Sequence, residues 1–516
     1  MFSEKDIQHI HNQGITIIQV NKQIERLKNG MLYANIVAAA TLGKGIESYN
    51  KKDIKKFIEL YETKQNQLSI VKFVPASGAA TRMFKYLFEF LEEFKPLKED
   101  ITSYTERKNN TAIDLFINNL QKFPFYNKVL NQIKTLNPEF DTLPDNVKHV
   151  AFIKTMLNKN NLNLSALPKG LLPFHRYHDK VVTAFYEHLF EASLYSSSNQ
   201  EAHIHFTVSK KHHNHFIDEL NKIKDSLQLK TNTTFKVSFS YQKKATATIA
   251  LTTKGSILRK KNGSIVFRPA GHGALLENLN KLNYDLIFIK NIDNIEVSHK
   301  SENTAIYKKL LAGILLDAQQ TSFSFLHKLD KGNLTDSDFK AMILFLKERL
   351  NLSVSDKFES LISSEKIRYL KKKLNKPMRV CGMVRNEGEP GGGPFWVKDD
   401  NNQVSLQIVE FAQINFSKKN QQSLVYKATH FNPTDLVCAV KNYKGEKFDL
   451  TKYVDHNAAF ITLKTSKGVT VKALELPGLW NGSMAYWNSI FVEVPSLTFN
   501  PVKTVNDLLK PAHQAS

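Results

Sequence analysis

Residues 71–90 read VKFVPASGAATRMFKYLFEF, and this stretch predicts the class of fold. Its first four residues are mostly apolar and predict a short strand, and an apolar-periodic helix is expected to begin near Arg82. Six small residues separate the two, from Ala76 to Thr81. Small residues let backbone N–H groups approach a phosphate, and a helix N-terminus adds partial positive charge. The stretch therefore predicts either a phosphate-binding loop or a plain strand-to-helix turn.

Strand and helix patterns alternate along the rest of the chain, which favours an α/β sandwich. Residues 1–70 predict a helical N-terminal segment. Residues 71–300 predict the first half of the core, with a helical insertion over 91–166. A second helical insertion is expected over 301–376, and 377–516 returns to strands and loops. We therefore expect one α/β core with a mixed central sheet and helical insertions.

The composition is that of a globular protein, with 516 residues, 42% of them hydrophobic and 23% charged. Two cysteines, Cys381 and Cys438, exclude a disulfide framework. The chain has no apolar run long enough to span a bilayer, and it begins with polar residues. We therefore expect a cytoplasmic protein that does not bind a membrane. The net charge of +22 favours anionic partners. Its lysines are scattered, which favours phosphorylated small molecules over nucleic acid.

Two loops carry candidate binding residues. Lys169 stands between Pro168 and Gly170, in a restrained loop where its charge can meet a phosphate. His272 stands between Gly271 and Gly273, where a flat ring could lie against the backbone. A plain loop lysine and a plain turn are the alternative interpretations.

The apolar strand around residues 286–290 ends in Asn291-Ile-Asp293-Asn294. In open α/β sheets ligands bind beyond the carboxyl ends of strands, and one carboxylate there suits Mg²⁺ together with substrate phosphates. A helix N-cap or a turn is the alternative. Glu410 ends a later strand, and Lys503 precedes a short helix. We interpret Trp480-Asn481 as core packing.

Taken in order, these segments resemble the UDP-N-acetylhexosamine and UDP-glucose pyrophosphorylases. The chain is also similar to a bacterial family known only as a domain of unknown function. Two departures stand out: Gly78 is the loop's single glycine where the family has three, and Ala274 replaces an acidic residue. The matching segments are Thr81-Arg82-Met83, Pro168-Lys169-Gly170, Phe239–Gln242, Pro269–Gly273, Asn291–Asn294, Ile408–Phe411 and Phe499–Leu509.

The resemblance implies a Rossmann-like nucleotide-diphospho-sugar transferase fold of the GT-A type, with the nucleotide-binding half in 71–300 and the sugar-binding half in 377–516. It implies a reaction that joins a nucleoside triphosphate, with UTP expected, to a sugar-1-phosphate and releases pyrophosphate. It implies catalytic roles for Arg82, Lys169 and Lys503, a Mg²⁺ ligand in Asp293, and sugar contacts from Asn291, Asn294 and Glu410. The implied nucleotide contacts are Ala76, Ser77, Gly78, Ala79, Ala80, Thr81, Gln242, Gly271, His272 and Gly273.

Three other functions stay open at this point. The altered glycine loop favours a non-catalytic nucleotide or nucleotide-sugar binding protein on the same fold. A basic nucleic-acid-binding protein would need a continuous basic face. A glycosyltransferase of related fold is the third, although the segment Pro501–Thr504 favours the pyrophosphorylases. The sequence indicates neither the sugar nor the oligomeric state, and the base is expected from the resemblance alone.

Overall fold

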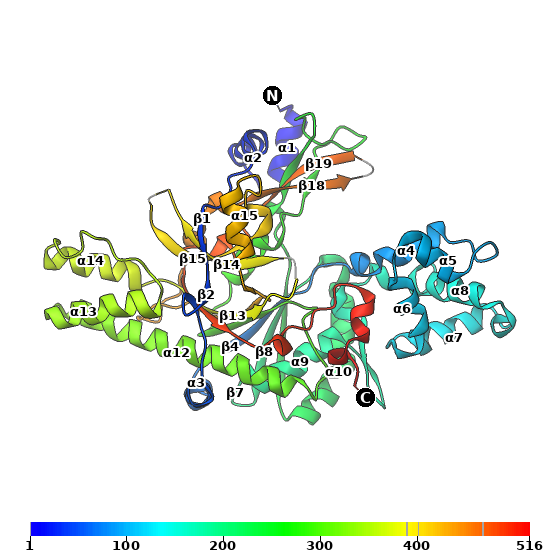
Figure 1. The fold of residues 1–516 in the computed structure, drawn as a ribbon, viewed down its shortest axis with the longest axis horizontal. Helices are drawn as coiled ribbons and strands as arrows, with labels where there is room; N and C mark the ends of the chain where they lie inside the picture. Colours follow the sequence, from blue (N-terminus) through cyan, green and yellow to red (C-terminus); the bar gives the residue numbers. More distant parts are fainter. Residues whose placement is uncertain (1, 389–390, 401, 467–468, 516) are drawn as a thin grey trace. The chain divides into compact units, whose positions relative to one another are not determined.

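The computed structural model describes residues 2–388, 391–400, 402–466 and 469–515 (Figure 1). The chain forms two compact units. The first comprises Met1–Phe73, Ser240–Ile289 and Tyr307–Ser496, and the second comprises Val74–Phe239, Lys290–Ile306 and Leu497–Ser516. The chain passes between them five times, so neither unit is a continuous segment. The predicted division into domains stays a prediction.

The first unit is built on a mixed sheet. Strand β13 is parallel to β20 and antiparallel to β17, and β12 is parallel to β4. Seven of its strands follow one another in the order β2 (Thr41–Leu42), β3 (Gly45–Glu47), β20 (Asn488–Glu493), β13 (Met378–Arg385), β17 (Asp435–Ala439), β12 (Leu286–Lys290) and β4 (Ile70–Pro75). All five residues of β17 and of β12 are buried, which is typical of strands covered on both faces. The predicted α/β class with a mixed central sheet is confirmed.

Two smaller sheets and a set of helices complete the first unit. One sheet pairs β1 (Ile36–Ala39), β14 (Gly392–Lys398) and β15 (Val404–Glu410), and the other pairs β11 (Phe267–Arg268), β10 (Thr248–Thr252), β19 (Val469–Glu475) and β18 (Phe460–Ser466). The short strand β16 (His430–Phe431) pairs with β13. The helices are α1 (Glu4–Asn12), α2 (Ile17–Asn29), α3 (Lys51–Gln65), α11 (Leu276–Leu279), α12 (Ser301–Lys331, whose first turn belongs to the second unit), α13 (Asp336–Leu344), α14 (Ser363–Leu374) and α15 (Lys419–Tyr426).

The expectation that residues 1–70 are helical throughout is wrong in its middle part. Strands β1, β2 and β3 lie between α2 and α3. They have two to four residues each, which is too short to show a period-two pattern. Their partners lie far along the chain, since β1 pairs with β14 and β3 pairs with β20.

The second unit is mainly helical. Helices α4 to α8 gather in one group (cyan in Figure 1) and α9 and α10 flank the strands. The helices are α4 (Lys85–Glu93), α5 (Ile101–Lys108), α6 (Ala112–Asn118), α7 (Tyr126–Leu136), α8 (Asp145–Leu157), α9 (Ala184–Tyr195) and α10 (His213–Thr231). The strands are β5 (Pro173–Arg176), β6 (Val181–Thr183), β7 (Ser197–Ser198), β8 (Glu201–Thr207) and β9 (Thr234–Ser240).

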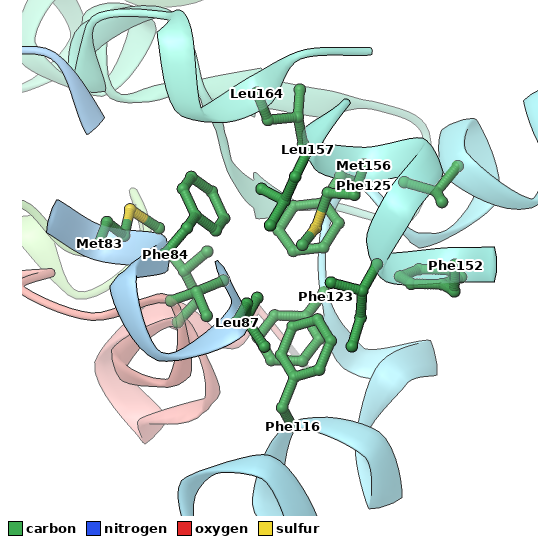
Figure 2. Packing of buried hydrophobic residues seen from close by; sticks show 14 of the residues in the cluster. Met83, Phe84, Leu87, Phe116, Phe123, Phe125, Phe152, Met156, Leu157 and Leu164 are labelled. Atoms are coloured by element: carbon green, nitrogen blue, oxygen red, sulfur yellow. The ribbon is translucent and has the colours of Figure 1, made fainter. Parts of the chain in front are cut away.

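An aromatic core holds the group of helices together (Figure 2). Phe116 and Phe123 have ring centroids 4.8 Å apart, and Phe123 stacks on Phe125 at 5.2 Å. Each fully buried Phe contributes about 1.5–3 kcal/mol of transfer free energy. Val502, Val505 and Leu508 from the end of the chain join the same core. The C-terminal segment is therefore held in the second unit by apolar packing.

The helix near Arg82 begins with a different kind of turn from the one expected. An α-helix was expected near Arg82, and the structure has a 3₁₀ helix, η1 (Ala80–Phe84), before α4 begins. Within the described ranges, no helix is both long enough and apolar enough to cross a membrane.

Candidate functional site

Four of the segments predicted to be functional meet in the second unit. The small-residue loop runs beside the loop of Lys169, because the Ala80 N–H donates to the Leu167 carbonyl (3.0 Å) and the Lys169 N–H donates to the Gly78 carbonyl (3.4 Å). The third and fourth segments, Asn291–Asn294 and Pro501–Thr504, are joined by a backbone bridge between Asn294 and Pro501. The Val502 N–H also donates to the Asp293 carbonyl at 3.0 Å.

The ammonium group of Lys169 ties these segments together. It donates to Asp293 Oδ2 and to the Val502 carbonyl, both at 2.7 Å. The two charged side chains keep 17% and 22% of their surface exposed, so solvent reaches the pair. The sequence indicated each residue singly, and the structure shows them as an ion pair.

The small-residue loop presents free donors to solvent. Ser77, Gly78 and Ala79 are exposed, and their three N–H groups have no hydrogen-bond partner among the described residues. Unpaired backbone N–H groups that reach solvent can donate hydrogen bonds to an anion. No residue of the loop adopts a left-handed backbone conformation, so one glycine suffices for this path. The guanidinium of Arg82 is exposed beside the loop.

The remaining residues of this loop anchor it. Ala76 donates its N–H to the Thr207 carbonyl at 2.9 Å, and Thr81 donates its hydroxyl to the Ser165 carbonyl at 3.2 Å. Ala80 is fully buried in the helical core. Of the predicted nucleotide contacts in the loop, Ser77, Gly78 and Ala79 are therefore the ones with free backbone donors.

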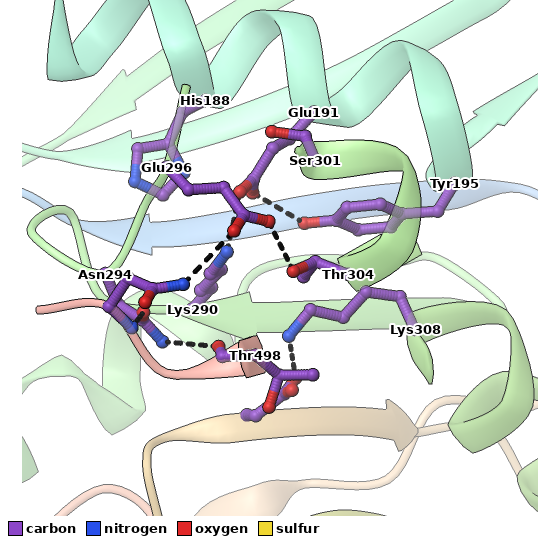
Figure 3. Close-up of polar contacts among 12 residues, drawn as sticks. His188, Glu191, Tyr195, Lys290, Asn294, Glu296, Ser301, Thr304, Lys308 and Thr498 are labelled. Atoms are coloured by element: carbon purple, nitrogen blue, oxygen red, sulfur yellow. Dashed lines mark hydrogen bonds and ion pairs between the residues drawn. The ribbon is translucent and has the colours of Figure 1, made fainter. Parts of the chain in front are cut away.

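Asn294 has a structural environment. It is buried, its Oδ1 accepts the Asn500 N–H at 2.8 Å, and its Nδ2 donates to the Thr498 carbonyl at 3.5 Å. Asn500 in turn donates to Glu296, which accepts the Thr304 hydroxyl (Figure 3). This chain of bonds holds the segment before Lys503 in place. Asn291 is half-buried and leaves its side chain free of hydrogen bonds within the described part of the chain.

Buried polar pairs hold the carboxyl end of β12 in place. Lys290, the last residue of β12, forms an ion pair of 2.6 Å with Glu191, which also accepts the Tyr195 hydroxyl (Figure 3). His188 contacts the Ile292 carbonyl at 3.1 Å. Because buried charges are retained only when they are paired, these bonds fix the backbone on both sides of Asn291.

Lys503 lies at the exposed end of the C-terminal segment. Its ammonium group lies 5.6 Å from the centroid of the Phe499 ring, and its N–H donates to Asp507 Oδ2 at 2.9 Å. Thr504 and Asp507 form a capping box that begins the next 3₁₀ helix. The lysine side chain itself therefore stays available to a ligand.

A second cluster of predicted residues forms in the first unit around His272. Leu479 donates its N–H to His272 Nδ1 at 2.8 Å, so a neutral ring carries its proton on Nε2, which lies 3.2 Å from Glu410 Oε1. The imidazole stacks on Trp480, with ring centroids 4.0 Å apart and an interplanar angle of 10°. Asn481 Nδ2 donates to the same Glu410 oxygen at 3.3 Å. His272 and Glu410 keep about a quarter of their side-chain surface exposed.

The two glycines beside His272 are required by the protein itself. Gly271 has φ +78°, and a Cβ on Gly273 would lie 2.0 Å from the Pro477 carbonyl oxygen. The predicted close approach at Gly273 is thus made by backbone of this chain. Gln242, the other predicted base contact, donates to Thr246 at 3.2 Å and forms no bond with the His272 cluster in the ranges described.

Sequence reasoning missed two members of this cluster. Trp480 packs against the hydrophobic core and Asn481 is buried, as the interpretation as core packing predicted, and Trp480 also stacks on His272. The available signal was Gly478 in the run Pro477-Gly478-Leu479-Trp480-Asn481, since glycine is favoured where the backbone is approached closely. A Cβ on Gly478 would lie 2.5 Å from His272 Cε1.

The residues present fit Mg²⁺ in one limited way. Asp293 supplies the one carboxylate among the four assembled segments, and its Oδ2 already accepts a hydrogen bond from Lys169. The described residues contain no group of three or more His, Cys, Asp or Glu side chains suited to a metal. Mg²⁺ is commonly held by one or two carboxylates plus substrate phosphates, so Asp293 could hold it together with a bound triphosphate.

Residues 3–514 match the family described as "Domain of unknown function (DUF4301)". The chain belongs to this family. The predicted similarity to a family of unknown function is therefore confirmed, and it extends over nearly the whole of this chain. No curated protein matches the sequence.

Solved structures similar to this DUF4301 protein include sugar-nucleotide pyrophosphorylases. UDP-N-acetylglucosamine pyrophosphorylase from Trypanosoma brucei, solved with an inhibitor, shares 10% identity over 98% of this chain and 79% of that one, with a TM-score of 0.48. A G45Y mutant of UDP-glucose pyrophosphorylase from Leishmania major, solved with UDP-glucose, shares 11% identity over 99% and 79%, with a TM-score of 0.42. UDP-glucose phosphorylase from Trypanosoma brucei shares 12% over 98% and 77%, with a TM-score of 0.44. The predicted resemblance to the UDP-sugar pyrophosphorylases is confirmed.

Proposed function

We propose that this DUF4301 protein is a nucleotidyltransferase that joins a nucleoside triphosphate, with UTP expected, to a sugar-1-phosphate. The observation that carries the proposal is the meeting of the small-residue loop, Lys169, Asp293 and the segment ending in Lys503. Three free backbone N–H groups and the exposed Arg82 suit the phosphates of a nucleotide. The fold would then be of the GT-A type implied by the motifs.

The reaction needs positioning and charge neutralisation more than covalent chemistry. A phosphate oxygen of the sugar-1-phosphate attacks the α-phosphorus of the triphosphate. A new P–O bond forms as the bond from the α-phosphorus to the bridging oxygen breaks, and pyrophosphate leaves with that electron pair. The loop N–H groups and Arg82 would hold the β- and γ-phosphates, and Lys169 and Lys503 would neutralise charge near the α-phosphorus.

Mg²⁺, when bound by Asp293 and the phosphates, would supply further neutralisation of the negative charge. Lys169 already lies 2.7 Å from Asp293, so a substrate phosphate would compete with the carboxylate for its ammonium group. Asn291 of the second unit, whose side chain has no hydrogen bond within the described part of the chain, is the proposed sugar contact beside these groups.

Pyrophosphate release tests the proposal, over four nucleoside triphosphates and common sugar-1-phosphates with Mg²⁺. We expect release with one pair of substrates and a loss of at least about 100-fold in Asp293→Ala and in Lys169→Met. Asp145→Asn is the matched control, because Asp145 lies in the second unit with 84% of its side chain exposed. An Asp293→Ala protein with the rate of the parent would refute the assignment.

The ion pair itself favours one second function, a nucleotide-binding protein without catalysis. Lys169 and Asp293 satisfy one another, which leaves the loop donors and Arg82 to bind phosphates alone. In that case calorimetry would detect nucleotide binding that Arg82→Ala weakens, while no pair of substrates releases pyrophosphate. The same panel therefore separates the two functions.

A further inference from the structure

A cavity of about 340 Å³ opens in the first unit, and none of Arg82, Lys169, Asp293 and Lys503 lines it. Lys373 and Lys376, at the end of α14, line one side of it, and Trp487 and Ser489, at the start of β20, line another. The strands β14 and β15 supply further lining, including Gln403 just before β15. The volume lies within the range of small-molecule sites.

Among the described residues, neither lysine forms an ion pair with a carboxylate. Lys373 donates only to neutral oxygens, the Ser353 carbonyl and Gln403 Oε1, each at 3.4 Å. Lys376 is half-buried, and its ammonium group has no hydrogen bond or ion pair with any residue in the described ranges. Burial, with Lys373 and Lys372 close by, lowers the pKa of Lys376 to about 8. Two like charges at one wall of a cavity repel one another unless an anion lies between them.

A third cation, Arg379, lies behind the cavity residue Ser489. Arg379 is fully buried on β13, and its Nε donates to the hydroxyl of Ser489 at 2.8 Å. Its NH1 bonds the Trp480 carbonyl, and its NH2 is buried with no partner in the described part of the chain. Trp487 Nε1 is buried and unpartnered in the same sense. A buried cation without a counter-charge is costly, so Arg379 favours negative charge in the cavity beside Ser489.

Three carboxylates also line the cavity, and Asp399 partly opposes the lowering of the Lys373 pKa by burial. Asp399 Oδ1 accepts the Gln403 N–H at 2.8 Å, and Asp455 Oδ1 accepts the Asn457 N–H at 2.8 Å. Each caps its own turn. Asp400 is exposed at the rim.

We propose that this cavity is a binding site for a small organic anion, whose phosphate or carboxylate group lies between Lys373 and Lys376. The Ser489 hydroxyl, which accepts a hydrogen bond from Arg379, lies in the lining of the same cavity. Tyr486 and Gln407 line the cavity farther along and contact its polar remainder. The site goes beyond the nucleotidyl transfer proposed above and does not depend on it.

Pyridoxal 5′-phosphate tests the site in the unaltered protein, because it carries a phosphate and an aldehyde. The uncharged amine of Lys376 condenses with the aldehyde with loss of water, and borohydride reduces the imine to a stable secondary amine that peptide mass spectrometry locates. Lys372 is the internal control, since it is exposed near the end of α14, four residues before Lys376, and does not line the cavity. At pH 8 we expect labelling of Lys376 at least about tenfold faster than of Lys372, since an ordinary lysine is almost fully protonated there.

Protection and variants then separate binding from mere reactivity. Citrate or inorganic phosphate at millimolar concentration should slow labelling of Lys376 at least fivefold and leave Lys372 unchanged. In calorimetry at pH 7, Lys376→Met should weaken citrate binding at least tenfold, whereas Lys372→Met should not change it. Equal labelling of the two lysines, absence of protection, or unchanged citrate binding in Lys376→Met would each overturn the proposal.

Discussion

Gly78 and Gly273 are two glycines in candidate segments with opposite surroundings. A Cβ on Gly78 would meet nothing within 4 Å, and its backbone is not left-handed. A Cβ on Gly273 would lie 2.0 Å from the Pro477 carbonyl oxygen, so that backbone must move. The same chemical change therefore has different consequences at the two positions.

For Gly78→Ala we expect a free energy of unfolding within about 0.5 kcal/mol of the parent, together with retained pyrophosphate release, because the N–H donor is kept. For Gly273→Ala we expect a loss of about 1–3 kcal/mol or more from overpacking. Urea unfolding at 25 °C measures both. A stable Gly273→Ala protein would show that the contact with Pro477 relaxes at little cost.

At the scale of elements, the C-terminal segment depends on the buried side chain of Asn294. Replacing it by alanine leaves the Asn500 N–H and the Thr498 carbonyl without their partner, and each buried unsatisfied group costs about 1–3 kcal/mol. We expect Asn294→Ala to speed hydrogen exchange of the amides from 498 to 503 at least tenfold. Asn291→Ala is the control, and equal exchange in the two proteins would contradict the anchoring role.

The pairing of β8 with β9 contains a histidine that should confer acid sensitivity. His205 accepts or donates a hydrogen bond with Ser238 at 2.8 Å, and burial lowers the pKa of His205 to about 4. The folded state then binds fewer protons than the unfolded state, whose histidine has a pKa near 6.5. The stability due to the neutral ring is complete above about pH 6.5 and is lost as the pH falls toward 4.

Replacing His205 by glutamine keeps a hydrogen-bonding side chain without the titration. Between pH 7.5 and pH 5 we expect the variant to lose about 2 kcal/mol less stability than the parent. Urea unfolding at the two pH values gives the difference. Parallel losses in parent and variant would mean that His205 is protonated in the folded protein at pH 5.

The elements also show what sequence could and could not predict. β4 and β12 were predicted because long apolar runs end in polar or small residues. The ion pair of Lys169 with Asp293 could not be, because 124 residues separate its members and no local pattern links them. Strands β1 and β3 were missed because their stability comes from β14 and β20, and Arg379 was missed because a cation on a buried strand contradicts the apolar pattern.

At the scale of the whole molecule, the net charge of +22 acts on every anion that approaches. We expect the association of nucleoside triphosphates to slow severalfold between 20 and 200 mM NaCl, since salt screens the long-range attraction. We also expect binding of double-stranded DNA to be lost by 150 mM, because the lysines are scattered. Stopped-flow mixing and fluorescence anisotropy measure the two effects. DNA binding that persists at 150 mM would restore nucleic acid as a partner.

The five passages of the chain between the two units bear on how the protein is made. On the ribosome, β20 of the first unit is synthesised after residue 487, and the residues Val502, Val505 and Leu508 of the second core come last of all. The aromatic core of the second unit is therefore complete only after residue 508 has been synthesised, more than 300 residues after most of its members. A premature stop near Ser496 would therefore remove part of the aromatic core together with the segment that carries Lys503.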